Sequence, residues 1–599
     1  MCYFHPDHGL LGHCHRLSSQ YRARHWSVHE LVLPHPYRSR HGLLLEEHAA
    51  HYRSGSHRDG RLPAGNAFPA SEFHPHVPRV GCRIFHPVSF RRDEGVADQR
   101  GTGENHRSNQ EKGNSMSDLN VMERVISSPD ADAIGGSATY CVGCGTCAFL
   151  DPAFTIAKNN DGCYQAFMQS GIQNPAKVES ACPFAGSANE DVIGNDLFGS
   201  QAGVQHDQYL GYYLNAYVGY VSADGWRSRG SSGGMVSWLA SKMLEDGLVD
   251  AVVHVKDGPD PEHMYTYQVS HSVEELKTGA KSKYYPVEMS EVLAYVREHE
   301  GRYLFIGIPC FVKAVRLLRR QDPVLNERIR YCIGLVCGHL KSDFFAKSEA
   351  WESGVPLEDI ARVDFRHKTP GSPASDYAVE VKRVGGGEPV VKRTAELSTT
   401  NWGLGYFKYN ACDYCDDVLA ETADVTFGDA WIPKYVNDGE GCNVIVVRNQ
   451  DVQDLIDAHR DEIVLHDSDS AEVYQSQAGG FRHRRQGLAY RLHAHQERGE
   501  WTPTKRVKPS LDGIGEQRQK TYAMRTTLKN ESFAAYREAV EADDFNVFKK
   551  HMKPVERQYA RVSVPFKKRV LRKAKQLVKA MLPASAVKNI KNLMGGGRS

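Results

Sequence analysis

Residues 303–318 read YLFIGIPCFVKAVRLL, and this stretch decides the fold class. Its apolar first half predicts a strand over Tyr303–Ile308, and the residues after the Gly-Ile-Pro-Cys turn predict a helix over Phe311–Arg319. The same alternation continues on both sides of the stretch. Strands are expected at residues 251–255, 333–336 and 444–447, and helices at residues 235–245 and 290–298. Strand-like runs that alternate with helical stretches predict an α/β domain.

The bulk composition is that of a globular protein with more than one domain. Of the 599 residues, 41% are apolar and 25% are charged, and a chain of this length is too long for a single hydrophobic core. The formal net charge of +1 gives the chain no electrostatic match to nucleic acid. No apolar run approaches the roughly 18 residues that span a bilayer, and no secretion signal is recognisable. We therefore expect a cytoplasmic protein whose 14 cysteines act mainly as metal ligands, catalytic groups or buried side chains.

The first 115 residues differ from the rest of the chain. They contain 15 of the 28 histidines and a single lysine, and their apolar residues follow neither the strand nor the helix period. The histidines also lack the short, regular spacing of metal-binding tracts. The six residues before Met116 can all be encoded by purine-rich codons, as a bacterial ribosome-binding site would be. We therefore expect translation to start at Met116. Residues 1–115 would then be a disordered, non-native leader from an over-extended gene prediction.

Three closely spaced cysteines form the most specific motif, Cys141-Val-Gly-Cys144-Gly-Thr-Cys147. Two successive C-x2-C spacings with glycines let the backbone wrap an iron–sulfur cubane, so that thiolates point inward and amides can donate to the sulfides. The expected fourth ligand is Cys182, because Asp151 stands where bacterial ferredoxins have their next cysteine. Two alternatives stay open: a four-cysteine zinc site, which also begins with C-x2-C, and Asp151 as a labile carboxylate ligand.

A second group of cysteines is scattered through the α/β region. Cys310 opens the helix of the first stretch, Cys337 ends the next predicted strand, and Cys412 and Cys415 form another C-x2-C. A single cysteine at a strand end is usually a small buried side chain, but the carboxyl ends of strands converge on one crevice in α/β sheets. The hypothesis is therefore a second cluster held by these four cysteines, with Cys332 as a substitute for Cys337. The cysteines after residue 140 that belong to neither set are interpreted as structural: Cys163, Cys332 and Cys442.

The turn Arg229-Gly-Ser-Ser-Gly-Gly234 precedes the predicted helix that starts near Met235. Small residues at a helix N-terminus leave room for a phosphate to meet unpaired backbone amides, although most such turns are simple caps. The turn is neither a Walker A motif nor a dinucleotide-binding G-x-G-x-x-G fingerprint.

Together these motifs resemble the family of beta subunits of coenzyme F-420-reducing hydrogenase and formate dehydrogenase, which also includes chlorophyllide-type reductases. The resemblance runs from about residue 140 to residue 449. It rests on the successive motifs CVGCGTC, SSGGMVSWLASKMLEDGLVDAVV, KSKYYP, LFIGIPCFVKAVRLL, LVCGHLKS, DFR, CDYCDD and ADVTFGDAW. The resemblance implies FAD and one or two 4Fe–4S clusters, and places near the flavin Ser231, Ser232, Gly233, Gly234, Lys283 and Tyr284.

The resemblance further implies an oxidoreductase that passes electrons between 4Fe–4S clusters and FAD, which exchanges a hydride with an organic substrate or a deazaflavin of the F-420 type. The expected partners are a ferredoxin-like or deazaflavin electron carrier and a larger oxidoreductase subunit. His339 and Lys283 are candidate catalytic residues that donate a proton or stabilise charge at flavin N1; the alternative is that both are satisfied structural side chains. Two other functions stay open, a non-catalytic electron-transfer subunit and a zinc-stabilised binding protein.

These inferences give an α/β (α+β) flavin domain, preceded by a small ferredoxin-like segment and followed by a helical extension. The predicted segments are 116–200 for the iron–sulfur part, 205–450 for the flavin domain, 451–550 for the helical extension and 551–599 for a basic tail. From residue 561 to residue 594 the tail has ten Lys or Arg and no Asp or Glu. Such a tail fits peripheral contact with anionic lipid or an acidic partner, and equally a solvated basic end.

Overall fold

The computed structural model describes residues 121–126 and 139–564, apart from residues 170, 187 and 224. The predicted leader 1–115, the proposed start at Met116 and most of the basic tail lie outside the described residues. By their contacts, all described residues fall into one unit. Among them, no helix combines the length and the apolar character that crossing a membrane requires.

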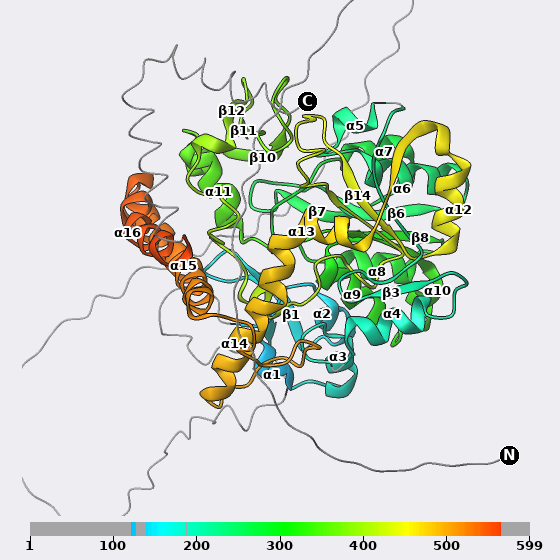
Figure 1. Cartoon of the computed structure of the whole chain (residues 1–599), viewed down its shortest axis with the longest axis horizontal. Helices are drawn as coiled ribbons and strands as arrows, with labels where there is room; N and C mark the ends of the chain where they lie inside the picture. Colours follow the sequence, from blue (N-terminus) through cyan, green and yellow to red (C-terminus); the bar gives the residue numbers. More distant parts are fainter. Residues whose placement is uncertain (1–120, 127–138, 170, 187, 224, 565–599) are drawn as a thin grey trace, which may run out of the picture. The chain divides into compact units, whose positions relative to one another are not determined.

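A mixed eight-stranded sheet forms the centre of the fold (Figure 1). Four neighbouring strands, in the order β6-β8-β9-β13, run parallel, and the strands outside them pair antiparallel. The sheet fits the predicted α/β (α+β) class. Its strands, in sheet order, are β15 (Ile463–Ser468), β5 (Asn215–Val221), β14 (Asn443–Val447), β13 (Val425–Asp429), β9 (Ile329–Leu335), β8 (Tyr303–Gly307), β6 (Ala251–Asp257) and β7 (Tyr265–Ser270).

Helices cover both faces of this sheet (Figure 1). Side chains alternate along a strand, so Leu304 and Ile306 of β8 enter one apolar cluster while Tyr303 and Phe305 enter the other. The first cluster includes α6 (Met235–Glu245), α7 (Val273–Thr278) and α12 (Gln450–Ala458). The second includes α8 (Ser290–Glu298), α9 (Pro309–Arg319) and α10 (Pro323–Arg328).

The segment before the sheet is short and rich in loops. Its hairpin pairs β1 (Phe154–Lys158) with β2 (Tyr164–Met168). A second small hairpin pairs β3 (Gln205–Asp207) with β4 (Gly211–Tyr213). The helices of this segment are α1 (Val121–Ile126), α2 (Thr146–Leu150), α3 (Pro175–Ala181) and α4 (Glu190–Phe198), and α5 (Trp226–Arg229) follows β5.

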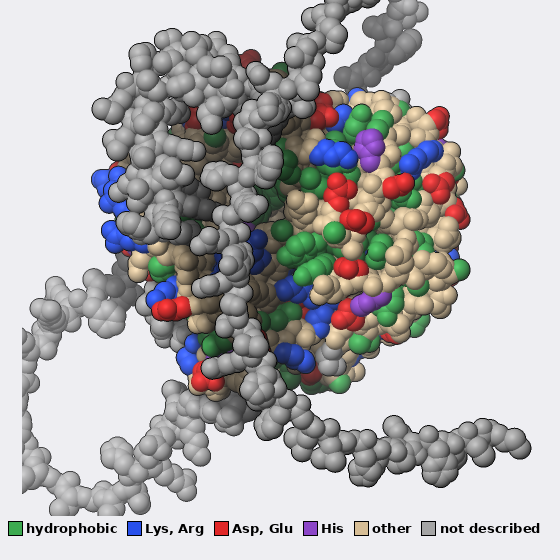
Figure 2. Space-filling model, viewed as in Figure 1, with side chains coloured by type: hydrophobic (Ala, Val, Ile, Leu, Met, Phe, Trp, Pro, Cys, Tyr) green, Lys and Arg blue, Asp and Glu red, His purple; other side chains and the backbone are tan. Residues whose placement is uncertain are grey.

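A small antiparallel sheet and a set of C-terminal helices complete the structure. The small sheet has the order β10 (Ile360–His367), β11 (Ala378–Arg383) and β12 (Val390–Arg393) and follows α11 (Asp343–Glu352). The last helices are α13 (Ser470–Arg484), α14 (Gln486–Glu497), α15 (Glu516–Glu541) and α16 (Phe545–Ser563), the last two packed side by side (Figure 1). In the view of Figure 2, acidic and basic side chains are interspersed over the sheet-bearing region, in line with the formal net charge of +1.

The predicted elements agree with the structure except at some boundaries. The helices predicted at 235–245 and 290–298 have the observed bounds, whereas α9 begins at Pro309 and β9 at Ile329. Two differences concern the predicted helical extension, 451–550. It contains β15, which pairs with β5 and extends the main sheet, and residues 498–515 form a connection without a helix.

Candidate functional site

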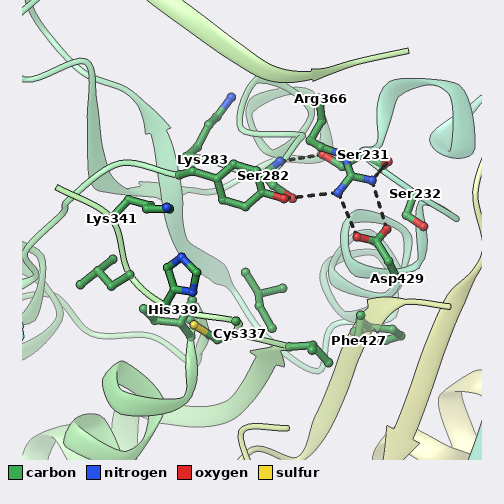
Figure 3. A pocket seen from close by; sticks show the side chains of 18 of the residues that line it. Ser231, Ser232, Ser282, Lys283, Cys337, His339, Lys341, Arg366, Phe427 and Asp429 are labelled. Carbon is green, nitrogen blue, oxygen red and sulfur yellow. Dashed lines mark hydrogen bonds and ion pairs between the residues drawn. The ribbon is translucent and has the colours of Figure 1, made fainter. Parts of the chain in front are cut away.

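A cavity of 660 Å³ lies at the carboxyl ends of the parallel strands. The ends of β8, β9 and β13 contribute Gly307, Leu335 and Asp429 to its lining, and β6 contributes Val255. In open α/β sheets this edge is the usual position of a ligand site, and the volume is within the range of small-molecule and cofactor pockets, about 300–1,000 Å³. Figure 3 shows part of its lining.

The turn before α6 forms one wall of the cavity, through Ser231, Ser232 and Gly234. Gly233, which the resemblance also places near the flavin, is not among the lining residues. A Cβ at Gly233 would lie 2.6 Å from Asn443 Oδ1 and 2.8 Å from the carbonyl oxygen of Gly219. Gly233 therefore lets the turn pack against β14 and β5, and so positions the two serines.

A buried arginine organises this wall. Arg366 of β10 forms an ion pair with Asp429 at 2.9 Å and donates hydrogen bonds to the Tyr284 hydroxyl at 3.3 Å and the Ser231 carbonyl oxygen at 3.2 Å (Figure 3). The Ser231 hydroxyl in turn accepts from the backbone N–H of Ser282 at 2.8 Å. Burial lowers the pKa of Arg366, but the Asp429 carboxylate more than offsets this, so its pKa lies well above the usual value. Arg366 stays charged at the cavity wall.

The two predicted catalytic residues both line the cavity, but they differ in setting. The His339 ring lies 4.4 Å from the Trp402 ring, and its buried Nε2 has no hydrogen-bond partner. Burial, with smaller contributions from Lys341 and Lys408, holds the pKa of His339 well below its usual value. Lys283 donates from Nζ to the Ala280 carbonyl oxygen at 3.2 Å, and burial lowers its pKa. In Figure 3 the Lys283 side chain extends away from His339.

The four cysteines of the second predicted set come together around one small cavity. Cys310 is in the first turn of α9, Cys337 follows β9, and Cys412 and Cys415 lie at the 3-10 helix η4 (Asn410–Tyr414). Leu340 donates its backbone N–H to Cys412 Sγ at 3.2 Å. Burial raises the pKa of Cys337 to about 12 and that of Cys415 to about 11.

Cys332, the predicted substitute for Cys337, lies elsewhere. It is fully buried in β9, its backbone N–H donates to Asp424 Oδ2 at 2.6 Å, and it does not line the small cavity. The other two cysteines interpreted as structural are also buried. Cys163 donates to the Asp161 carbonyl oxygen at 3.8 Å, and Cys442 lies 3.7 Å from Arg227 Nη2.

The first predicted set also converges. Burial raises the pKa of Cys147 well above its usual value, and the neighbouring Cys141, Cys144 and Cys182 raise it further. The backbone N–H groups of Gly143 and Ala166 donate to Cys141 Sγ at 3.3 and 3.4 Å. The tight loop that this requires is made possible by Gly143 and Gly145, with φ of 64° and 90°.

Asp151, weighed above as a ligand, uses both carboxylate oxygens in a different role. They accept hydrogen bonds from the backbone N–H groups of Ala153 at 2.9 Å and Gln173 at 2.8 Å. Burial raises the pKa of Asp151, but the backbone hydrogen bonds outweigh it, so the pKa is lowered overall. In this arrangement Asp151 fixes the loop after the cysteines. Among the described residues, no three His, Cys, Asp or Glu side chains are grouped as ligands of a single metal ion.

The two cysteine sets and the large cavity are contiguous. Val142, between two cysteines of the first set, lines the small cavity of the second set. Cys337 and Cys412 line both the small and the large cavity, as do Ile308, Leu340 and Arg484. A path through protein atoms therefore leads from the first cysteine loop to the second set and on to the large cavity.

Sequence reasoning missed several residues of this cavity. Arg366 and Asp429 belong to the quoted motifs DFR and ADVTFGDAW, and their place in these motifs was the available signal. Lys341 belongs to the quoted motif LVCGHLKS but was not singled out there. Trp402, Arg484 and Arg525 carry no local signal, because they reach the cavity only through tertiary packing.

Two family models match the chain. The model described as coenzyme F-420 hydrogenase/dehydrogenase, beta subunit (N-term), matches residues 216–294, and the corresponding C-terminus model matches residues 300–472. An uncharacterized protein of Methanocaldococcus jannaschii is 25% identical over 244 residues, which are 40% of this chain and 82% of that protein. A subunit of the F(420)H(2) dehydrogenase of Methanosarcina mazei is 23% identical over 236 residues, 39% of this chain and 60% of that protein.

Among solved structures, a chain of the F-420-reducing [NiFe] hydrogenase complex from Methanosarcina barkeri is 15% identical, with a TM-score of 0.38. The match covers 48% of this chain and 96% of that chain.

Proposed function

The chain belongs to the family of coenzyme F-420 hydrogenase/dehydrogenase beta subunits, and from this premise we propose that it is an FAD- and 4Fe–4S-dependent oxidoreductase that exchanges electrons with an organic substrate or a deazaflavin. The observation that carries the proposal is the contiguity of two four-cysteine sets, whose members are buried or half-buried, with a cofactor-sized cavity. Electron transfer requires neighbouring redox centres, and Cys337 and Cys412 belong to both the second cysteine set and the lining of the large cavity.

The donor chemistry of both cysteine sets fits iron–sulfur clusters. Cys141, Cys144, Cys147 and Cys182 would hold one cluster, and Cys310, Cys337, Cys412 and Cys415 the other. Thiolates are the usual ligands of 4Fe–4S clusters, which transfer one electron at a time, and backbone N–H groups that donate to the ligand sulfurs tune their potential. Such donors are present at Cys141 and Cys412. The raised thiol pKa values mean that a bound cation is needed to keep these buried groups deprotonated.

The large cavity fits FAD in volume and in chemistry. The turn at Ser231 and Ser232 precedes the 11-residue helix α6, whose N-terminal end favours a phosphate. Arg366 adds a fixed positive charge beside this turn, and Tyr284 is held by the same guanidinium. Bound there, FAD would connect one-electron transfer with two-electron chemistry.

The protein's own side chains would control protons in the cavity. The lowered pKa keeps the His339 imidazole neutral at physiological pH, with its Nε2 unpartnered in the described structure. His339 can therefore exchange a hydrogen bond or a proton with a ligand in the cavity. Lys283, hydrogen-bonded to its own loop, is in a weaker position for this role but lines the same cavity.

An assembly with a larger oxidoreductase is a related proposal, supported by the relative whose name describes a subunit. In that case the chain would transfer electrons for a partner's substrate site. Co-purification of a large subunit with the native protein would support this role. A cytoplasmic location and electron exchange with a ferredoxin-like carrier belong to the same proposal.

Anaerobic purification followed by iron, sulfide and flavin assays tests the proposal. We expect about eight iron and eight sulfide atoms per chain for two 4Fe–4S clusters, and bound FAD. Cys141→Ser and Cys310→Ser should each remove about half of the iron, whereas Cys332→Ser, outside both sets, should keep all of it. A colourless preparation with zinc and no iron would show instead a zinc-stabilised protein and overturn the proposal.

A further inference from the structure

One wall of the large cavity carries positive charge that the surrounding protein does not balance. We call it the Trp402 wall. In Figure 3 its residues His339 and Lys341 lie on the opposite side of the view from the Arg366–Asp429 ion pair. All of its members line the cavity, and they are His339, Lys341, Trp402, Lys408 and Arg525.

Lys341 is the most deeply buried cation of this wall, with 1% of its surface exposed. Its Nζ donates to the Tyr406 carbonyl oxygen at 2.5 Å and lies 4.9 Å from the centroid of the Trp402 ring. Among the described residues, no carboxylate lies within ion-pair distance of it. Burial lowers the pKa of Lys341 to about 7, and the positive charges of Lys408 and Arg525 act in the same direction.

The nearby acidic groups do not balance this charge. Glu349 raises the pKa of Lys341, but the two side chains form no ion pair, and burial raises the pKa of Glu349 itself well above its usual value. Asp413 is ionised, but it is shared by Lys408, Arg491 and Lys529. A buried cation without an anionic partner costs free energy, and a bound anion would remove that cost.

Arg525 and His339 complete the wall. Arg525 of α15 donates to the Gly403 carbonyl oxygen, and no carboxylate pairs with it among the described residues. His339 is more than nine-tenths buried, lines the cavity, and has an Nε2 without a partner. The Trp402 ring beside them offers an aromatic face on which a planar ligand can pack.

The opposite wall differs in its charge balance. There the guanidinium of Arg366 is paired with the Asp429 carboxylate, and the cavity is lined by the start of α6. We propose that Lys341, His339 and Arg525 form an oxyanion-binding subsite, which takes the carboxylate or phosphate of an aromatic substrate packed against Trp402. That this ligand is the substrate rests on the proposed function. That the subsite binds an aromatic oxyanion does not depend on the proposed function.

Binding of small probes to the purified full chain tests the subsite. Benzoate and phenyl phosphate are the anionic probes, and benzamide is the neutral probe of similar shape. Dissociation constants are measured by calorimetry and, in flavin-containing protein, by the change in the flavin absorption spectrum. We expect at least one anionic probe to bind more tightly than benzamide. Lys341→Met and Arg525→Gln should weaken that anion at least tenfold, because each removes a charge-assisted contact, and should leave benzamide binding and FAD content unchanged.

The control is Lys553→Met, which removes an exposed lysine of α16 and should change nothing. Three results would each overturn the subsite. The first is that neither anion binds the wild-type protein, and the second is that the Lys341 and Arg525 variants bind anions as tightly as the wild type does. The third is that these variants lose FAD, which would assign the wall to the flavin phosphates. Protein that contains no flavin would refute the proposed function alone, since calorimetry with the same probes still decides whether the subsite exists.

Discussion

The guanidinium of Arg484 lies directly against Cys337. Its Nη2 donates to the Cys337 carbonyl oxygen at 3.0 Å and lies 3.7 Å from the thiol sulfur. Arg484 is 3% exposed, and its Nε and Nη1 have no hydrogen-bond partner in the described structure. Burial lowers its pKa, but the negative charge of Cys415, Cys337 and Cys412 as thiolates raises it more strongly, so Arg484 stays charged beside them.

This contact predicts an effect on the reduction potential of a cluster at the second cysteine set. A positive charge favours the more negative, reduced state of the cluster. Arg484→Gln should therefore shift the midpoint potential of that cluster to a more negative value, and Arg484→Lys should restore part of the shift. The measurement is a redox titration followed by electron paramagnetic resonance. Arg482→Gln, on the exposed side of the same helix, is the control. An unchanged potential in an iron-replete Arg484→Gln protein would contradict the prediction.

The ion pair between Arg366 and Asp429 should contribute to stability. The Arg366 side chain is 4% exposed and that of Asp429 is 22% exposed. Asp429→Asn leaves the buried guanidinium without its counter-ion, and we expect a loss of about 3 kcal/mol in the free energy of unfolding. Urea denaturation measures it. Asp438→Asn, which breaks the more exposed pair with Arg227, should cost at most about 1 kcal/mol.

The coupling of that pair can be measured separately. Arg366→Met combined with Asp429→Asn should destabilise the protein by less than the sum of the two single substitutions, because the first removes the charge that the second leaves unpaired. Additive effects would show that the two side chains act independently.

The pKa of Lys341 predicts how oxyanion binding depends on pH. With a pKa of about 7, its amino group is charged below neutral pH and loses its proton as the pH rises. The affinity for the anionic probe should therefore be highest below about pH 7 and fall above it. The same titration with Lys341→Met should lose this step while benzamide binding stays flat in both proteins. An identical pH profile in wild type and variant would exclude Lys341 as the titrating group.

The sequence predicts the parts of the site that have local causes. The helices at 235–245 and 290–298 follow from their apolar spacing and have the observed bounds. The convergence of Cys310 and Cys337 follows from the topology of parallel strands, since both residues come directly after neighbouring strands.

The remaining features depend on pairings that the sequence does not encode locally. The alternation of apolar and polar residues over 463–468 is too short to predict a strand within the helical pattern around it. These residues become β15 by pairing with β5, which lies more than 200 residues earlier in the chain. Arg366 meets Asp429 only because β10 of the small sheet lies near the end of β13. Arg525 reaches the Trp402 wall from α15, a helix whose polar sequence predicts no binding role.

The last prediction concerns the pairing of α15 with α16. His551 of α16 contacts Glu531 and Glu538 of α15, with nitrogen–oxygen distances of 2.8 Å to each. Burial lowers the pKa of His551, but the two carboxylate hydrogen bonds outweigh it, so the folded pKa is raised. The stabilisation is then fully present below the unfolded pKa of about 6.5 and is lost as the pH rises through the folded value.

The expected result is a pH-dependent difference between wild type and His551→Gln. The unfolding midpoint of the wild type should be higher than that of the variant, and this difference should be larger at about pH 6 than at about pH 9. The reason is that only the protonated imidazole binds both carboxylates as a cation. Thermal denaturation followed by circular dichroism gives both midpoints, and His493→Gln on α14 serves as the control. A difference of equal size at both pH values would mean that His551 stabilises the helix pair by packing alone, without its charge.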